Sequence, residues 1–270
     1  VSQTYANEIR EADNGYGLNG LLQHREKDLI GILNGIDEKH WNPGTDYHLE
    51  QKYNRRSLDK KVINKTALQK QFKLPVSKTI PLFGIVSRLV EQKGLDIILQ
   101  CIPELMKLNL QIVILGTGEL HYEMQLSELA QQYPDKLIVK IGYNEKLAHQ
   151  IEAASDMYLM PSRFEPCGLN QLYSLRYASL PIATHVGGLA DTVVHASDYN
   201  INNKTANGFI LEEHSAKALL NTISQAMHLY QQPDIWKQLQ LNATSCDHTW
   251  ENSAEHYIHL YEQALAKKTA

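Results

Sequence analysis

The chain has 270 residues, of which 43% are hydrophobic and 21% are charged. This composition is typical of a globular protein, and the length fits one complete domain with additional segments. The formal net charge of −4 gives no basic surface of the kind that binds nucleic acid. No apolar run approaches the ~18 residues that a bilayer crossing requires, so we expect no membrane partner.

The three cysteines have no metal-ligand spacing, and their odd number favours a reducing compartment. The opening sequence "VSQTYANEIREADNGYG" is polar and has no apolar core of a signal peptide. We therefore expect a protein of a reducing compartment such as the cytoplasm.

The first 78 residues lack a regular alternation of strands and helices. A helical segment comes first, followed by the strand-like "LIGIL" at 29–33 and a loop rich in Asn, Gly, Pro and Asp at 34–46. Residues 48–75 are predicted to form a polar connector and then a helix, "NKTALQKQFKL" (64–74).

From residue 80 onward, short apolar segments alternate with segments of helical periodicity. This pattern predicts right-handed βαβ units and a Rossmann-like, doubly wound parallel sheet, in which ligands bind outside the carboxyl ends of the strands. The expected strands are 80–89, 111–118, 136–143, 156–162, 180–188 and 207–213, and the expected helices are 93–109, 121–133, 145–155 and 169–179.

A long helix is predicted at the C-terminus, over residues 250–268. Its apolar residues Tyr257, Leu260, Tyr261 and Leu265 fall along one stripe. An apolar stripe on a helix needs a partner surface, so we expect this helix to pack on another part of the protein.

Arg88 and Lys93 lie between a predicted strand end and the start of the next helix, in "SRLVEQKG". Two cations beside a helix N-terminus make a suitable site for an anion such as a phosphate. The alternative is that both are ordinary solvated loop charges.

The next two strand ends give weaker signals. Gly116 and Gly118 in "GTGEL" would let the backbone approach a ligand, although the full dinucleotide motif is absent and a tight turn is the simpler interpretation. Tyr143, at the end of the following strand, could stack on a base or could simply pack against the protein.

The stretch "SRFEPCG" contains the strongest local signal. Glu165 precedes a proline, which favours an extended conformation that directs the carboxylate towards the strand-end crevice, where it could accept hydrogen bonds from sugar hydroxyls. Cys167 has no nearby histidine in the sequence to activate it, so a packing or backbone role is favoured over a nucleophilic one.

Gly187 and Gly188 in "HVGGLADT" offer amides that could hold an anion or a hydroxyl, and Asp191 is expected to cap or orient that loop. No D-x-D or D-x-x-D pair occurs in the strand-end loops, which argues against a chelated divalent metal holding a diphosphate. Arg88 and Lys93 are the only close cationic pair among these loops.

Four segments together resemble the bacterial glycogen synthase and plant starch synthase family. They are "NGIDEKHWNPGTD" (34–46), "SRLVEQKGLD" (87–96), "SRFEPCGLNQLYSLRYA" (162–178) and "GGLADTV" (187–193). The resemblance covers essentially the whole chain, in the right order. It implies a GT-B fold and a retaining transferase that moves glucose from ADP-glucose to the non-reducing-end 4-hydroxyl of an α-1,4-glucan, with neither metal nor other cofactor.

The same resemblance implies roles for individual residues. Arg88 and Lys93 would bind the distal diphosphate and stabilise departing ADP, and Glu165 would contact the donor glucose; these are the three expected catalytic residues. Tyr143 would stack on adenine. The residues expected to bind the donor are Asn34, Gly116, Gly118, Tyr143, Cys167, Gly168, Leu169, Asn170, Gly187 and Gly188.

Three residues depart from the wider pattern. Asn170 stands where the family more usually has Thr, and His185 where a small hydroxyl residue is common. Tyr173 takes the place of the second Glu in the E-x7-E pattern of related retaining transferases, which is ordinary for this family and argues against the sucrose- and trehalose-type branches.

The N-terminal domain of the family, with its K-x-G-G-L loop, has no counterpart in this sequence. We therefore expect the donor-binding half of the enzyme, whose partners are ADP-glucose or ADP, the glucan and the N-terminal domain. The alternative is a nucleotide-sugar-binding module that is inactive alone. The expected segments are 1–36 (tail of the N-terminal domain), 37–78 (linker and first helix), 79–248 (nucleotide-sugar-binding domain) and 249–270 (helix crossing back).

Overall fold

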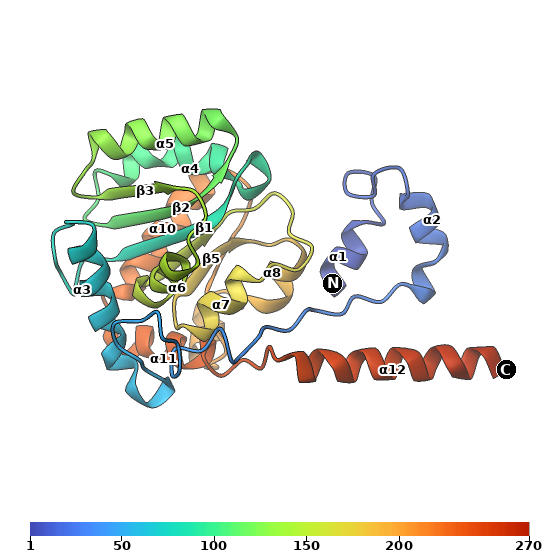
Figure 1. Cartoon of the computed structure of the whole chain (residues 1–270). Coiled ribbons are helices and arrows are strands. Elements are labelled where there is room, and N and C mark those ends of the chain that lie inside the picture. The colour runs from blue at the N-terminus through green and yellow to red at the C-terminus, as the bar shows by residue number, and fades with distance from the viewer. Residues whose placement is uncertain (270) are drawn as a thin grey trace.

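In a computed structural model, which describes residues 1–269, a parallel six-stranded sheet is covered by helices on both faces (Figure 1). The strand order β3-β2-β1-β4-β5-β6 is that of a doubly wound Rossmann-like sheet, so the predicted fold class is confirmed. The strands are β1 Leu82–Leu89, β2 Gln111–Gly118, β3 Leu137–Ile141, β4 Met157–Met160, β5 Leu180–Thr184 and β6 Phe209–Leu211.

The helices that pack around this sheet include the five that were predicted before residue 180, whereas the four between residues 187 and 243 were not predicted. In chain order, the helices are α3 Lys61–Gln71, α4 Leu95–Leu105, α5 Leu120–Gln132, α6 Glu145–Ala154, α7 Asn170–Arg176, α8 Gly187–Thr192, α9 Asp198–Asn202, α10 Ala216–Tyr230 and α11 Pro233–Ala243. Short 3-10 turns precede α3 and α4, at η2 Arg55–Lys60 and η3 Glu91–Lys93.

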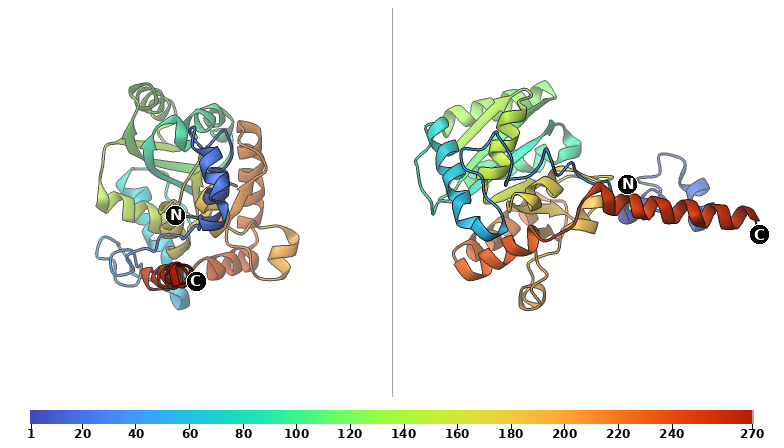
Figure 2. Two further views of the ribbon diagram at one scale, coloured as in Figure 1. Left: turned by 90° about the vertical axis from the view of Figure 1, so that its right-hand side faces the viewer. Right: turned by 60° about the horizontal axis from the view of Figure 1, so that its bottom comes forward.

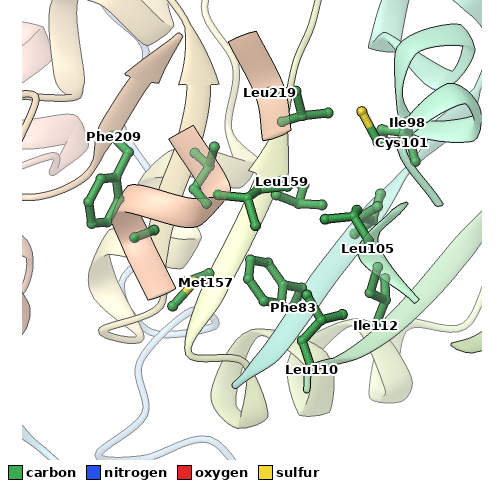
Figure 3. Packing of buried hydrophobic residues seen from close by; sticks show 14 of the residues in the cluster. Phe83, Ile98, Cys101, Leu105, Leu110, Ile112, Met157, Leu159, Phe209 and Leu219 are labelled. Carbon is green, nitrogen blue, oxygen red and sulfur yellow. The ribbon is translucent and has the colours of Figure 1, made fainter. Parts of the chain in front are cut away.

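The strands are apolar on both faces because both faces are buried. On one face, Phe83, Ile112 and Leu159 pack against side chains of α4 and α10 (Figure 3). On the opposite face, Leu82 and Val113 belong to a second cluster, which includes side chains from α3, α6 and α8. The sheet is therefore a rigid support for the loops at the carboxyl ends of its strands.

Two of the predicted elements are wrong in detail. Residues 29–33 are extended, but they form no strand because none of the described segments pairs with them. The strand predicted over 180–188 ends at Thr184, and Gly187 is already the first residue of α8. An apolar extended segment becomes a strand only where a neighbouring strand completes its hydrogen bonds, and the sequence alone does not supply that information.

Both ends of the chain extend from the body that contains the sheet (Figures 1 and 2). The N-terminal segment contains α1 Gln3–Glu8, α2 Asn19–His24 and η1 Glu26–Asp28, and the C-terminal helix α12 spans Trp250–Thr269. The Ile36 N–H donates to the His248 carbonyl at 2.8 Å, and Lys267 Nζ lies 2.8 Å from Asp28 Oδ1. The segment before residue 36 and α12 are thus neighbours.

The predicted apolar stripe on α12 is only partly covered. Tyr257 and Leu260 are half-buried, whereas Tyr261 is 63% exposed and Leu265 is 65% exposed. None of the helices in residues 1–269 combines the length and apolar character that a bilayer crossing requires. The segment boundaries at 36, 78 and 248 stay predictions.

A buried lysine attaches the first turn of α3 to the sheet. Lys61 Nζ donates to the Ala153 carbonyl at 2.8 Å and to Ser179 Oγ at 2.9 Å. Burial lowers the pKa of Lys61 to about 7, although the charges of Asp156 and Glu152 act in the opposite direction. The side chain is therefore neutral in the folded chain under mildly alkaline conditions.

We expect the free energy of unfolding to rise between about pH 7 and pH 10.4. Above about pH 7 folded Lys61 is deprotonated, whereas the unfolded chain keeps the proton until about pH 10.4; the unfolded state therefore binds more protons in this window. Lys61 contributes at most ~1.4 kcal/mol per pH unit to this rise in the free energy of unfolding. Urea unfolding of the wild-type chain and of Lys61→Met at several pH values measures the difference in slope, and equal slopes would contradict the assignment.

Candidate functional site

The order of the sheet reverses between β1 and β4, and a crevice opens there at their carboxyl ends. Two adjoining pockets occupy this region. The polar pocket, about 220 Å³ in volume, is lined by Arg88, Lys93, Ser162, Glu165, Gly168 and Leu169 among others. The apolar pocket, about 240 Å³, is lined by Arg88, Leu115, Gly116, Thr117, Tyr143 and Ala148 among others.

The polar pocket contains an ion pair between Lys93 Nζ and Glu165 Oε2. Ser162 Oγ lies 3.3 Å from the same carboxylate oxygen. Glu165 is only 7% exposed, so the pair is shielded from water and its electrostatic interactions are stronger than at a solvated surface. The sequence placed the two charged groups in this crevice, but it gave no sign that they would contact each other.

Backbone contacts fix the loop that contains Glu165. The Arg163 N–H donates to the Gln92 carbonyl at 2.9 Å, and Gln92 Nε2 donates to the Phe164 carbonyl at 3.0 Å. The loop after β1 is therefore tied to the loop after β4. Gln92 and Ser162 were not predicted as site residues; the only available signal was their place in the sequence, Gln92 next to Lys93 and Ser162 three residues before Glu165.

Arg88 lines both pockets and is exposed. Its Nη2 donates to Gln92 Oε1 at 2.7 Å, and within residues 1–269 no carboxylate lies within ion-pair distance of the guanidinium. Lys93, by contrast, is neutralised by Glu165. Of the two predicted cations, Arg88 is therefore the one whose charge no carboxylate of the described residues balances. It lies where the two pockets meet.

The apolar pocket has a large aromatic ring at its edge. Tyr143 is 86% exposed, which is unusual for a ring whose only function is packing. Asn170 lines both pockets, and its Nδ2 donates to the Val86 carbonyl in the second half of β1. A flat ring beside an apolar slot suits an aromatic base, and the shared Arg88 lies next to it.

Cys167 adjoins Gly168 in the sequence but lines neither pocket. Burial raises the pKa of its thiol, which disfavours the reactive thiolate, and the side chain is 6% exposed. Its carbonyl accepts a hydrogen bond from Gln171 Nε2 at 2.9 Å. The interpretation of Cys167 as a packing residue is therefore favoured over the nucleophilic one.

Gly187 and Gly188 line neither pocket, and their amides have partners within the chain. The Gly188 N–H donates to the Glu165 carbonyl at 3.0 Å, and the Gly187 N–H donates to Glu8 Oε1 at 2.8 Å. A Cβ on Gly188 would lie 1.8 Å from the Cys167 carbonyl oxygen. These glycines allow α8 to approach the loop of Glu165, and direct contact with a donor stays a prediction.

Three other predicted residues also lie outside the two pockets. Asn34 lines a separate cavity beside α12, and the Gly118 N–H donates to Glu123 Oε1 at 2.8 Å in a tight turn. Asp191 does not cap its own loop; its carboxylate accepts from the backbone N–H groups of Gln3, at 2.8 Å, and Thr4, at 3.1 Å. It therefore caps α1, a partner that lies far away in the sequence.

Comparison with known families was made against this geometry. The family model described as "Glycosyl transferases group 1" matches residues 67–240, which includes the whole sheet and both pockets. The chain belongs to this family. Glycogen synthase of Cellvibrio japonicus is 51% identical over 261 residues, covering 97% of this chain and 54% of that protein.

Solved structures agree with this assignment. The catalytic domain of Arabidopsis thaliana starch synthase IV, bound to ADP and acarbose, matches with a TM-score of 0.92 and 38% identity, covering 98% of this chain and 55% of that chain. A sucrose-phosphate synthase from Thermosynechococcus elongatus matches at 0.58 and 19% identity, over 87% of this chain and 52% of that one, which shows the fold alone. The chain spans about half the length of the curated relatives it matches.

We expect Gly188→Ala to destabilise the chain by about 1–3 kcal/mol or more, because the new methyl group would overlap the Cys167 carbonyl oxygen. Gly20→Ala is the matched control, since a Cβ there meets no atom within 4 Å. Thermal unfolding of both variants measures the difference. Equal melting temperatures for the two variants would show that α8 does not pack on the Glu165 loop as described.

Proposed function

We propose that this chain is the donor-binding half of a glycogen or starch synthase. The complete enzyme would transfer glucose from ADP-glucose to the non-reducing-end 4-hydroxyl of an α-1,4-glucan, with retention of configuration. The observation that carries the proposal is the arrangement of one apolar and one polar pocket on either side of Arg88. A nucleoside diphosphate sugar has the same order of parts: a flat base, a dianionic bridge and a polyhydroxyl ring.

In this arrangement adenine occupies the apolar pocket and stacks on Tyr143. The diphosphate lies at Arg88 and Lys93, and the glucosyl ring lies beside Glu165 in the polar pocket. Gly168 and Leu169, which line that pocket, place backbone groups beside the sugar. The choice of adenine over uracil comes from the family resemblance and from the similarity to a starch synthase structure bound to ADP.

The reaction leaves about one additional negative charge on the diphosphate as the glycosidic bond breaks. Fixed cations in a partly dehydrated crevice stabilise that charge in the transition state, and each such group is worth on the order of 3 kcal/mol. Arg88 can act at once, since no carboxylate of the described residues neutralises it. Lys93 becomes available as sugar hydroxyls take over part of the hydrogen bonding to Glu165.

We also propose that the donor binds without a metal ion. Glu165 is the only carboxylate among the residues that line the two pockets, and Lys93 already pairs with it. Bridging a divalent ion to a diphosphate requires free carboxylate oxygens, which these pockets do not offer. Arg88 and Lys93 supply the positive charge instead.

The acceptor glucan and the K-x-G-G-L loop belong to the other half of the family enzyme in this proposal. The half-exposed face of α12 and the adjoining segment before residue 36 are the surfaces nearest to that half. The three free cysteines suit a reducing compartment, and we propose the bacterial cytoplasm, or a plastid for a plant enzyme.

Isothermal titration with ADP and UDP tests the donor site. We expect ADP to bind more tightly than UDP, and Tyr143→Ala to raise the ADP Kd by at least about fivefold, since loss of base stacking costs about 1–3 kcal/mol. Tyr199→Ala is the control because Tyr199 is 76% exposed on α9, away from both pockets. Tighter UDP binding would exclude the adenine assignment.

Transfer activity tests the chemistry. In an enzyme that contains both halves, Lys93→Gln should lower kcat about a hundredfold, whereas Lys107→Gln, at an exposed ion pair with Glu104, should leave it unchanged. The 270-residue chain alone should not incorporate labelled glucose into glycogen. Incorporation by this chain alone would contradict the requirement for the other half, and normal donor binding without transfer by the complete enzyme would favour a pure binding module.

A further inference from the structure

A second cluster of titratable side chains lies outside both pockets, where the linker after residue 36 meets α6. It consists of His40, Glu145 and His149, one potential ligand atom of each lying within 4.8 Å of the others. We refer to these three residues as the His–Glu cluster. The proposed function assigns no role to any of them.

The backbone brings these three side chains together in a defined way. Glu145 and His149 are four residues apart on α6, so they share one face of the helix, and Asn144 caps its first turn. His40 comes from a turn in which Asp37 Oδ1 accepts hydrogen bonds from the Lys39 N–H at 2.9 Å and the His40 N–H at 3.2 Å. Two ordered elements therefore supply the cluster.

The tautomer of His149 follows from its contact with a buried carboxylate. His149 Nδ1 lies 2.7 Å from Asp46 Oδ2, and the Tyr177 hydroxyl donates to the same oxygen at 2.6 Å. A carboxylate oxygen accepts hydrogen bonds, so Nδ1 carries the hydrogen in this contact, and in that tautomer the lone pair is on Nε2.

That lone pair has no partner within the described chain. His149 is 0% exposed, and its Nε2 is a buried polar atom without a hydrogen bond among residues 1–269. Such an atom is costly to bury and usually has a partner. A ligand atom of His149 lies within 4.8 Å of ligand atoms of His40 and Glu145, and His40 Nε2 and Glu145 Oε1 lie 2.7 Å from each other.

Aromatic stacking holds the imidazole in place. Trp41 stacks on His149 with ring centroids 3.8 Å apart and planes 9° apart, and Tyr173 stacks on Trp41 at 3.8 Å and 10°. His40 meets His149 edge to face at 4.9 Å. The ring of His149 is therefore fixed, and only the two outer side chains need to adjust around a ligand.

We propose that His40, Glu145 and His149 form a binding site for a divalent transition metal ion of the zinc class. Two imidazole nitrogens and one carboxylate oxygen are a donor set that suits such ions. Asp46 has the role of the outer carboxylate that commonly orients a metal-ligating histidine. The ion would join the linker to α6, next to Asn144, which lines the apolar pocket.

This site is separate from the donor site and needs no assumption about transfer chemistry. The simplest competing description is a hydrogen-bonded pair of His40 and Glu145 at the surface. That description leaves the buried Nε2 of His149 without a partner, whereas a bound ion would satisfy it. The two descriptions therefore differ in whether the chain binds one metal ion.

Titration of the untagged, metal-free chain with Co²⁺ tests the proposal. We expect one equivalent to produce the visible ligand-field absorption of a protein-bound low-coordinate ion, and Zn²⁺ to abolish that absorption by competition. Glu145→Gln and His40→Gln should each weaken binding by about 10–100-fold. Both residues are only partly buried or exposed, and melting in a chelator verifies that the variants fold as the wild-type chain does.

Glu119→Gln and His121→Gln are the matched controls, since these residues form an exposed His–Glu pair, 3.6 Å apart, that is not part of any three-ligand group in the described chain. They should bind Co²⁺ as the wild-type chain does. The absence of a saturable 1:1 absorption, or equal Co²⁺ affinity in the wild-type chain and the Glu145→Gln and His40→Gln variants, would overturn the proposal. Because these readouts involve no nucleotide or glucan, failure here is distinguishable from failure of the proposed function.

Discussion

The ion pair between Lys93 and Glu165 is the contact on which the site depends, because it joins the loop after β1 to the loop after β4 at the point where the sheet order reverses. The hydrogen bonds of the Gln92 carbonyl and side-chain amide with residues 163 and 164 strengthen the same connection. The charge of Lys93 is therefore balanced before any ligand binds, and Arg88 is left as the unmatched cation. This division suits the proposed donor site, in which a diphosphate meets the unmatched cation and a sugar lies beside a carboxylate.

The sheet could be predicted because its strands are short, apolar and separated by helices of regular periodicity. The same regularity placed Arg88, Lys93, Glu165 and Tyr143 at strand ends, and parallel strands bring their carboxyl ends together at one edge. Local sequence therefore determined which side chains could meet. It did not determine which atoms would bond, and Gln92 and Ser162 were missed because nothing about their residue type distinguishes them from other polar loop residues.

Contacts between distant segments were not predictable. The amide of Gly187 was expected to hold an anion or a hydroxyl of a ligand. Its partner is instead the side chain of Glu8, 179 residues away in the sequence. Asp191 was expected to cap or orient its own loop, but it caps the distant helix α1. The contact of His149 with Asp46 likewise joins residues 103 positions apart. In each case the residue type indicated that a polar group needs a hydrogen-bond partner. Only the folded structure shows which residue that partner is.

The contact between α1 and α8 affects how the protein can be divided for expression. Glu8 and Asp191 each bond across it, so the first eight residues are anchored to the body that contains the sheet even though they precede the linker. A recombinant fragment that starts at residue 37 would leave the Gly187 amide and the Asp191 carboxylate without these partners, directly behind the loop of Glu165. A useful cloning boundary therefore lies before Ser2, whose hydroxyl caps α1, rather than at the apparent junction between segments.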